Sequence, residues 1–144
     1  MARKLTLTIG LLVACAWCFS LVSPAANSEP TSGAAFKPVA SVHSLMEGQG
    51  LVFSQLQMAL GNKNAAQRAK QIHSYAEVLA ELANVNTFNN EKADYRGWAT
   101  QLRDTALALA AEGKKNPAPD EGKVNELFSK IKNTCQACHD VYQN

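Results

Sequence analysis

Between residues 39 and 142 the apolar positions recur at steps of three and four, the spacing that places side chains on one face of an α-helix. The first such stretch runs from residue 39 to residue 60 and is followed by Gly61-Asn62, a pair that commonly ends a helix. Its expected inward face consists of Val39, Val42, Met46, Gln49, Phe53, Leu56 and Leu60. The pattern therefore predicts an amphipathic helix over residues 39–60.

Three further stretches have the same spacing. The second is expected over residues 65–83, with a loop from Asn84 to Asn90 after it. The third is expected to start near Asn90-Glu91 and to stop at Gly113, and the fourth to start after an N-cap at Asp120. The inward face of the fourth contains Val124, Phe128, Ile131, Cys135, Cys138 and Tyr142.

Nothing in this region has the strict alternation of a β-strand bounded by turns. Helices of about 20 residues are about 30 Å long, and the expected connections between them are short. Short connections between long amphipathic helices place sequence neighbours antiparallel. The predicted fold class is all-α, an antiparallel up-down-up-down four-helix bundle over residues 39–144.

The N-terminal segment has the pattern of an export signal. Arg3 and Lys4 precede an apolar run over residues 5–22, and small residues follow at 23–26. We expect residues 1–26 to be a signal peptide and the protein to be periplasmic. Two alternatives remain open: the run is just long enough to stay as a membrane anchor, or Cys15 is lipidated.

Residues 27–38 are polar and punctuated by proline, so we expect a flexible arm before the bundle. The chain has 14 Lys+Arg and 12 Asp+Glu, and removing Arg3 and Lys4 leaves 12 of each, a net charge of zero. No basic stripe remains that would favour nucleic acid as a partner. Contact with a membrane is expected only if the N-terminal segment is retained or lipidated.

The last helix ends in Cys135-Gln136-Ala137-Cys138-His139, the attachment pattern of c-type haem. Two thiols at this spacing can add to the two vinyl groups of one porphyrin, and the adjacent histidine can then bind the iron. On a helix, Cys135 and His139 are four residues apart and share a face. The pattern predicts one covalently bound haem c per chain near the C-terminus, held by Cys135 and Cys138, with His139 as an axial ligand.

Other uses of a Cys-x-x-Cys pair are weaker here. Cys15 and Cys18 lie in the expected signal, so no second pair is left to complete a zinc site. A thioredoxin-like redox pair needs a strand before its helix, and the chain has no strand pattern. A short-loop disulfide, and with it a haem-free structural helical bundle, remains an alternative.

Few residues follow His139, so a sixth iron ligand has to come from earlier in the chain. The candidates are Met46, Met58, His43 and His73. Met46 is on the expected inward face of the first helix and His43 is one turn before it, whereas Met58 is off that face. His73 follows the inward Ile72 and is expected to point outward.

The segment from Asn133 to Tyr142, with Trp98 in the third helix, resembles the class II cytochromes c, which are cytochrome c prime and its low-spin, methionine-ligated relatives. Residues 45–50 resemble the stretch that supplies the methionine ligand in the low-spin members. The resemblance implies a His/Met-ligated iron with Met46 as sixth ligand, and a possible homodimer. One position departs from the pattern, because Gln143 stands where the family usually has a basic residue.

These observations lead to the expectation of an electron carrier that transforms no substrate. It would exchange single electrons with redox partner proteins through small, transient interfaces. The alternative is a cytochrome c prime-type protein with five-coordinate iron that binds nitric oxide or carbon monoxide. Peroxidase-like chemistry is not expected, because no distal acid–base pair is evident in the sequence.

Overall fold

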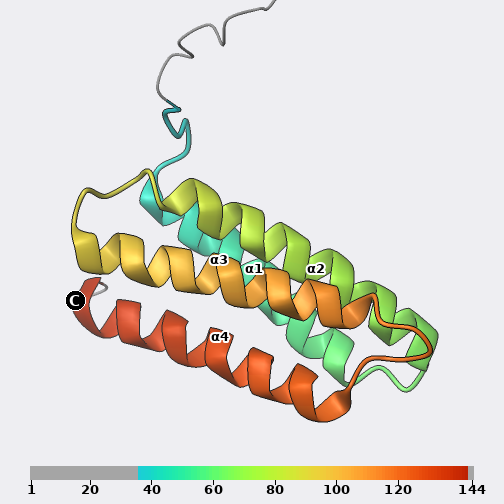
Figure 1. The fold of residues 1–144 in the computed structure, drawn as a ribbon. Helices are drawn as coiled ribbons and strands as arrows, with labels where there is room; N and C mark the ends of the chain where they lie inside the picture. The colour runs from blue at the N-terminus through green and yellow to red at the C-terminus, as the bar shows by residue number, and fades with distance from the viewer. Residues whose placement is uncertain (1–35, 143–144) are drawn as a thin grey trace, which may run out of the picture. The chain divides into compact units, whose positions relative to one another are not determined.

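A computed structural model describes residues 36–142, which form four sequential α-helices packed antiparallel as a bundle (Figure 1). The helices are α1 (Val42–Leu60), α2 (Ala65–Asn86), α3 (Ala93–Gly113) and α4 (Glu121–Tyr142). The predicted all-α four-helix bundle is confirmed. The expected signal segment and most of the expected arm lie outside the described residues. Within residues 36–142, no helix combines the length and the apolar character needed to span a membrane.

The ends of the first two helices follow from local capping. The Ser41 hydroxyl accepts a hydrogen bond from the Ser44 backbone N–H at 3.1 Å, so α1 begins at Val42 and Val39 lies before it, exposed. Asn64 caps α2 in the same way, accepting from the Gln67 N–H at 3.0 Å. The second helix continues three residues past the expected end, through Asn86.

The connection between α3 and α4 is held by side chains. Asp120 caps α4 as predicted, with its carboxylate accepting from the Lys123 N–H at 3.0 Å. The buried Glu112 carboxylate accepts from the Asp120 N–H at 2.8 Å and from the Lys115 ammonium at 2.7 Å. The Lys115 contact, followed by the Asp120 N–H, lowers the pKa of Glu112, which keeps the carboxylate ionised. Arg68 of α2 pairs with Glu121, which ties the starts of α2 and α4 together.

The apolar core fills one half of the bundle. It is formed by the second half of α1, the middle of α2, the second half of α3 and the first half of α4. Its fully buried members include Leu56, Ile72, Leu79, Leu109, Val124 and Ile131. The other half contains the start of α1, the end of α2, the start of α3 and the end of α4, where the Cys-x-x-Cys-His motif lies.

Helices α2 and α3 approach closely because small residues face each other along them. Ala76, Ala80 and Ala83 of α2 are buried, as are Ala106 and Ala110 of α3. Small side chains allow two helix backbones to lie near one another, with the contact made by close packing of many atoms.

Gly113 lies where the backbones of α3 and α2 come close together, and Gly113→Ala is expected to destabilise the protein by about 1–3 kcal/mol. A Cβ atom there would lie 2.8 Å from the His73 backbone nitrogen and 3.0 Å from the Ala69 carbonyl oxygen, so the helices would have to separate. Gly97→Ala is the matched control: its Cβ meets nothing within 4 Å, and a gain of up to about 1 kcal/mol is expected. Urea unfolding followed by circular dichroism measures both. Equal effects of the two substitutions would contradict the close-approach argument.

Candidate functional site

A cavity of about 300 Å³ lies in the half of the bundle that the apolar core leaves unfilled. Within the described residues, the backbones of α1 and α4 stay more than 8 Å apart at every Cα, so these two helices meet only through side chains. The rings of Phe53 on α1 and Phe128 on α4 stack with centroids 5.0 Å apart and bridge the gap between these two helices. Gly50, Lys132 and Gln136 line the cavity and are exposed, so it reaches the surface.

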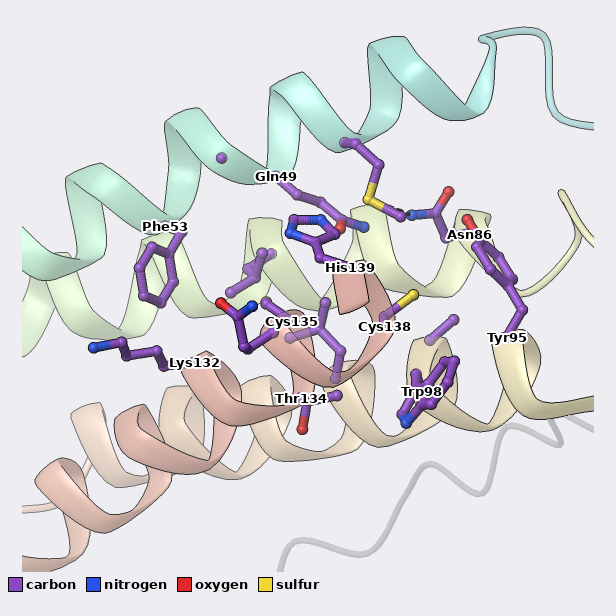
Figure 2. A pocket seen from close by; sticks show the side chains of 16 residues that line it. Gln49, Phe53, Asn86, Tyr95, Trp98, Lys132, Thr134, Cys135, Cys138 and His139 are labelled. Atoms are coloured by element: carbon purple, nitrogen blue, oxygen red, sulfur yellow. Dashed lines mark hydrogen bonds between the residues drawn. The ribbon is translucent and has the colours of Figure 1, made fainter. Parts of the chain in front are cut away.

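All three motif residues predicted to hold the cofactor line this cavity. The helix α4 is continuous through them, so Cys135, Cys138 and His139 lie within little more than one turn. Cys138 is buried and Cys135 and His139 are half-buried. Figure 2 shows the His139 imidazole between α4 and α1, near Gln49. No hydrogen-bond partner for this imidazole occurs among the described residues, which leaves both ring nitrogens available.

Met46 lines the same cavity from the opposite helix, α1. It is half-buried, and its sulfur accepts a weak hydrogen bond from the Asn86 side-chain amide at 3.9 Å. The cavity therefore lies between an imidazole on α4 and a thioether on α1. These are two of the groups that can occupy the axial positions of a haem iron.

The other candidate ligands lie elsewhere. His43 is exposed, with its imidazole 3.4 Å from the Glu47 carboxylate, and it does not line the cavity although it is one turn before Met46. Met58 is exposed, in agreement with its expected place off the inward face. The prediction that His73 points outward is wrong: its Nδ1 lies 3.1 Å from the Ala110 carbonyl oxygen, between α2 and α3. Of the four candidates, the structure brings only Met46 to the motif.

The C-terminal end of α4 is held against the start of α3 by a cluster of aromatic side chains. The Tyr142 hydroxyl donates to the Asp94 carboxylate at 2.7 Å, and its ring meets those of Tyr95 and Trp98 edge to face at 5.3 and 6.0 Å. Burial, and then the contact with Asp94, raises the pKa of Tyr142 to about 12. The phenol therefore stays protonated and keeps donating to Asp94, which joins the last turn of α4 to the start of α3.

Two buried polar groups on the cavity wall have no partner among the described residues. They are the side-chain nitrogen of Gln49, a residue 7% exposed, and the hydroxyl of Tyr95, 3% exposed (Figure 2). Burial raises the pKa of Tyr95, so its hydroxyl stays a donor. An unpaired buried donor costs about 1–3 kcal/mol, so both groups favour a ligand that presents acceptors.

The residues around the cavity fit a porphyrin. Phe53, Leu79 and Leu102 supply apolar walls for a flat ring, and the two unpaired donors can face its carboxylates or another acceptor at the iron. The two thiols and the imidazole come from α4 and the thioether from α1, and these are groups that could attach a porphyrin and bind its iron. Gln49 and Met46 are three residues apart on α1, and both face the cavity.

Both motif thiols are shifted toward the neutral form. Burial, and then the neighbouring Cys138, raises the pKa of Cys135 to about 11; burial also raises the pKa of Cys138. A neutral thiol is a poor nucleophile toward alkylating reagents and disulfides. In the folded, haem-free chain we therefore expect two reduced and slowly reacting thiols.

At pH 8 the haem-free protein should react with iodoacetamide at Cys135 about 100-fold more slowly than an unfolded chain. A pKa of about 11 in place of about 9 lowers the thiolate fraction by two powers of ten. The rate should rise about tenfold per pH unit up to about pH 11. Mass spectrometry of timed samples measures it, with the same protein in urea as the control. Equal rates with and without urea would contradict the burial of this thiol.

Asn86 was not predicted as a site residue. The sequence pattern placed it in a loop, whereas the structure places it at the end of α2, 2% exposed, on the cavity wall. A signal was present, because Leu79, Ala83 and Asn86 continue the inward face of α2 at steps of four and three. The polar residues around Asn86 resemble a turn, and for this reason the sequence pattern predicts a loop there in spite of the helical spacing.

Comparisons with known proteins give no match for this chain, whether with family models, with curated proteins or with solved structures.

Among the described residues, no three or more His, Cys, Asp or Glu side chains come together in a group that could hold a metal ion. The function therefore has to be argued from the cavity and its lining residues.

Proposed function

We propose that this protein is an exported c-type cytochrome of the class II type, which carries single electrons on one covalently bound haem. One observation carries the proposal. Cys135, Cys138 and His139 on α4 line the same cavity as Met46 on α1, although about 90 residues separate the two groups in the chain. The cavity between them is largely apolar, which suits the ring of a porphyrin.

Each residue has a role in this proposal. Cys135 and Cys138 would each hold the porphyrin by adding S–H across a vinyl double bond, so that sulfur bonds to one carbon and the hydrogen goes to the other, with no leaving group and no oxidant. The His139 imidazole and the Met46 sulfur would bind the iron. When bound, the haem supplies a one-electron ferric–ferrous couple. The surrounding helices hold it in place in both oxidation states.

The exposed part of the cavity wall suits exchange of electrons with another protein. Lys132 and Gln136 of α4 are exposed and line the cavity, so a bound haem would have one edge near solvent. Electron-transfer partners typically meet through small, short-lived interfaces. A redox protein that docks over this edge would come close to the cofactor without displacing any helix.

The test is the absorption spectrum of the purified ferric and ferrous protein after expression with a c-type haem attachment system. We expect a low-spin spectrum with a methionine-to-iron charge-transfer band in the ferric state, and reversible one-electron reduction. Haem staining of a denaturing gel is the companion measurement, because thioether bonds survive denaturation. A protein without covalent haem would refute the proposal.

A second candidate function is binding of nitric oxide or carbon monoxide at five-coordinate iron. The unpaired Gln49 nitrogen favours it, because a buried amide donor on the cavity wall could hold a ligand with an acceptor atom. In that case Met46 would shield the iron without binding it. A high-spin ferric spectrum with rapid uptake of carbon monoxide after reduction would favour this candidate over the electron carrier.

A further inference from the structure

We propose that Asn86 is a positioning residue that holds the Met46 sulfur and raises the reduction potential of the iron. This inference rests on the proposed His/Met ligation. Asn86 has no part in the motif and is far from Met46 in sequence, and it is the last residue of α2. Its side chain is nevertheless buried on the cavity wall, and Figure 2 shows its amide joined to a sulfur by a dashed line.

The Asn86 amide has one orientation that satisfies its neighbours. The Asn89 side-chain amide donates to the Asn86 side-chain oxygen at 3.2 Å, and the Asn86 nitrogen then faces the Met46 sulfur at 3.9 Å. A flipped Asn86 amide would set its oxygen against the sulfur, where both atoms are acceptors. Asn89 therefore directs the N–H group of Asn86 toward the thioether.

The end of α2 does not explain why this side chain is buried. The Asn86 backbone carbonyl accepts from the Asn89 N–H at 3.1 Å. The N–H groups of Thr87 and Phe88 donate to the carbonyls of Asn84 and Val85. These contacts are all made by the backbone, so they need no amide side chain at position 86. Burying a primary amide is costly unless it is hydrogen-bonded, and the sulfur and Asn89 supply its partners.

A thioether sulfur has two lone pairs, so Met46 can donate one to iron while the other faces Asn86. The N–H contact withdraws electron density from the sulfur, which makes it a poorer donor to ferric iron. The positive end of the N–H dipole points at the sulfur, so with iron bound to Met46 it would disfavour the additional positive charge of the ferric state. Both effects favour the ferrous state, so Asn86 should raise the potential, as partners of metal ligands commonly tune a metal.

The test compares Asn86→Val with Asn84→Val in the haem-loaded protein. Both variants replace an asparagine of α2 with the same residue, but Asn84 does not line the cavity. At a fixed solution potential, the ferrous-to-ferric ratio of Asn86→Val should fall about threefold to tenfold, the size expected for one neutral hydrogen bond. A tenfold change corresponds to 59 mV for a one-electron couple. Asn84→Val should stay within about twofold of the wild type in spectroelectrochemical titration.

The methionine charge-transfer band is recorded in the same samples. A lower potential with the band retained, or loss of the band in Asn86→Val alone, supports the inference. An unchanged potential with an unchanged band overturns it, and so does an equal shift in Asn84→Val. If the wild type binds haem covalently but has no methionine band, the proposed ligation fails, and this inference fails with it. That outcome is visible before any variant is made.

Asn89→Ala tests the same inference if Asn86→Val cannot be obtained as a folded, haem-loaded protein. It keeps the donor on Asn86 and removes only the contact that orients it. Asn89 is only half-buried and follows the end of α2, so its truncation should be well tolerated. A reproducible fall of the ferrous-to-ferric ratio, by less than threefold at the same solution potential, supports the inference. An unchanged ratio overturns it.

Discussion

Cys135→Ala/Cys138→Ala is expected to remove covalent haem completely, from one per chain to none. Both thiols line the cavity, and thioether bonds to the porphyrin require both sulfurs. Intact-mass spectrometry of the exported protein should show the loss of one porphyrin mass, and haem staining of a denaturing gel should give a blank lane. No other substitution in this chain should have so large an effect on the absorption spectrum.

The chain provides its own control for this experiment. Cys15 and Cys18 form a second Cys-x-x-Cys pair, followed by Phe19 where the motif has a histidine. Cys15→Ala/Cys18→Ala should leave the haem content at one per chain. Haem that stays covalently bound after Cys135 and Cys138 are replaced would contradict the assignment. A wild-type exported chain in which Cys135 and Cys138 can both still be alkylated would also contradict the assignment.

Met46→Ala should convert a low-spin ferric spectrum to a largely high-spin one and abolish the methionine charge-transfer band. The Met46 sulfur lines the same cavity as His139, so in the proposed ligation alanine would leave one position on the iron to water or to a small ligand. The reduction potential should fall as well, because thioether ligation favours the ferrous state. Absorption and electron paramagnetic resonance spectra of the purified protein measure the change.

Met58→Ala is the matched control, because Met58 lies on the same helix but is 61% exposed and away from the cavity. It should leave spectrum and potential unchanged. A low-spin spectrum that survives Met46→Ala would mean that another residue binds the iron. His43 would then be the next residue to replace, although its exposed side chain beside Glu47 would have to turn inward. Unfolding of Met46→Ala is not expected, since Met46 is only half-buried and outside the apolar core.

Much of the helical architecture could be inferred from the residue pattern alone. The steps of three and four along residues 42–60 and 121–142 match the buried faces in part. The predicted Gln49, Leu56, Val124, Ile131 and Cys138 are buried, but so are Leu45, Ala59, Leu127 and Thr134, which lie beside the predicted positions. Asp120 caps α4 as expected. These features are local: an amphipathic face, an N-cap and a short connection depend on residues a few positions apart. The antiparallel arrangement follows from the short connections between helices of similar length.

The misjudged positions are those where a tertiary contact outweighed local preference. The end of α2 runs through a polar stretch that resembles a turn, yet Asn86 is buried against the cavity. His73 occupies a position that periodicity places outside, but the close approach of α3 covers it and brings the Ala110 carbonyl to its ring. His43 and Met46 share nearly one face of α1, yet only Met46 reaches the cavity. The periodicity shows which side of a helix is apolar, but it does not show which other helix or cavity lies against that side.

The prediction of covalent haem rests on the motif residues alone, because two thiols and a following imidazole at this spacing are typical of c-type haem attachment, and it stays a prediction. The sequence could also show which helix faces are apolar. It could not show that α1 and α4 stay apart around a cavity, because that separation depends on how all four helices pack at once. Only the packed bundle brings Met46, from the first helix, to the same cavity as His139, from the last, and places the Asn86 amide beside the sulfur.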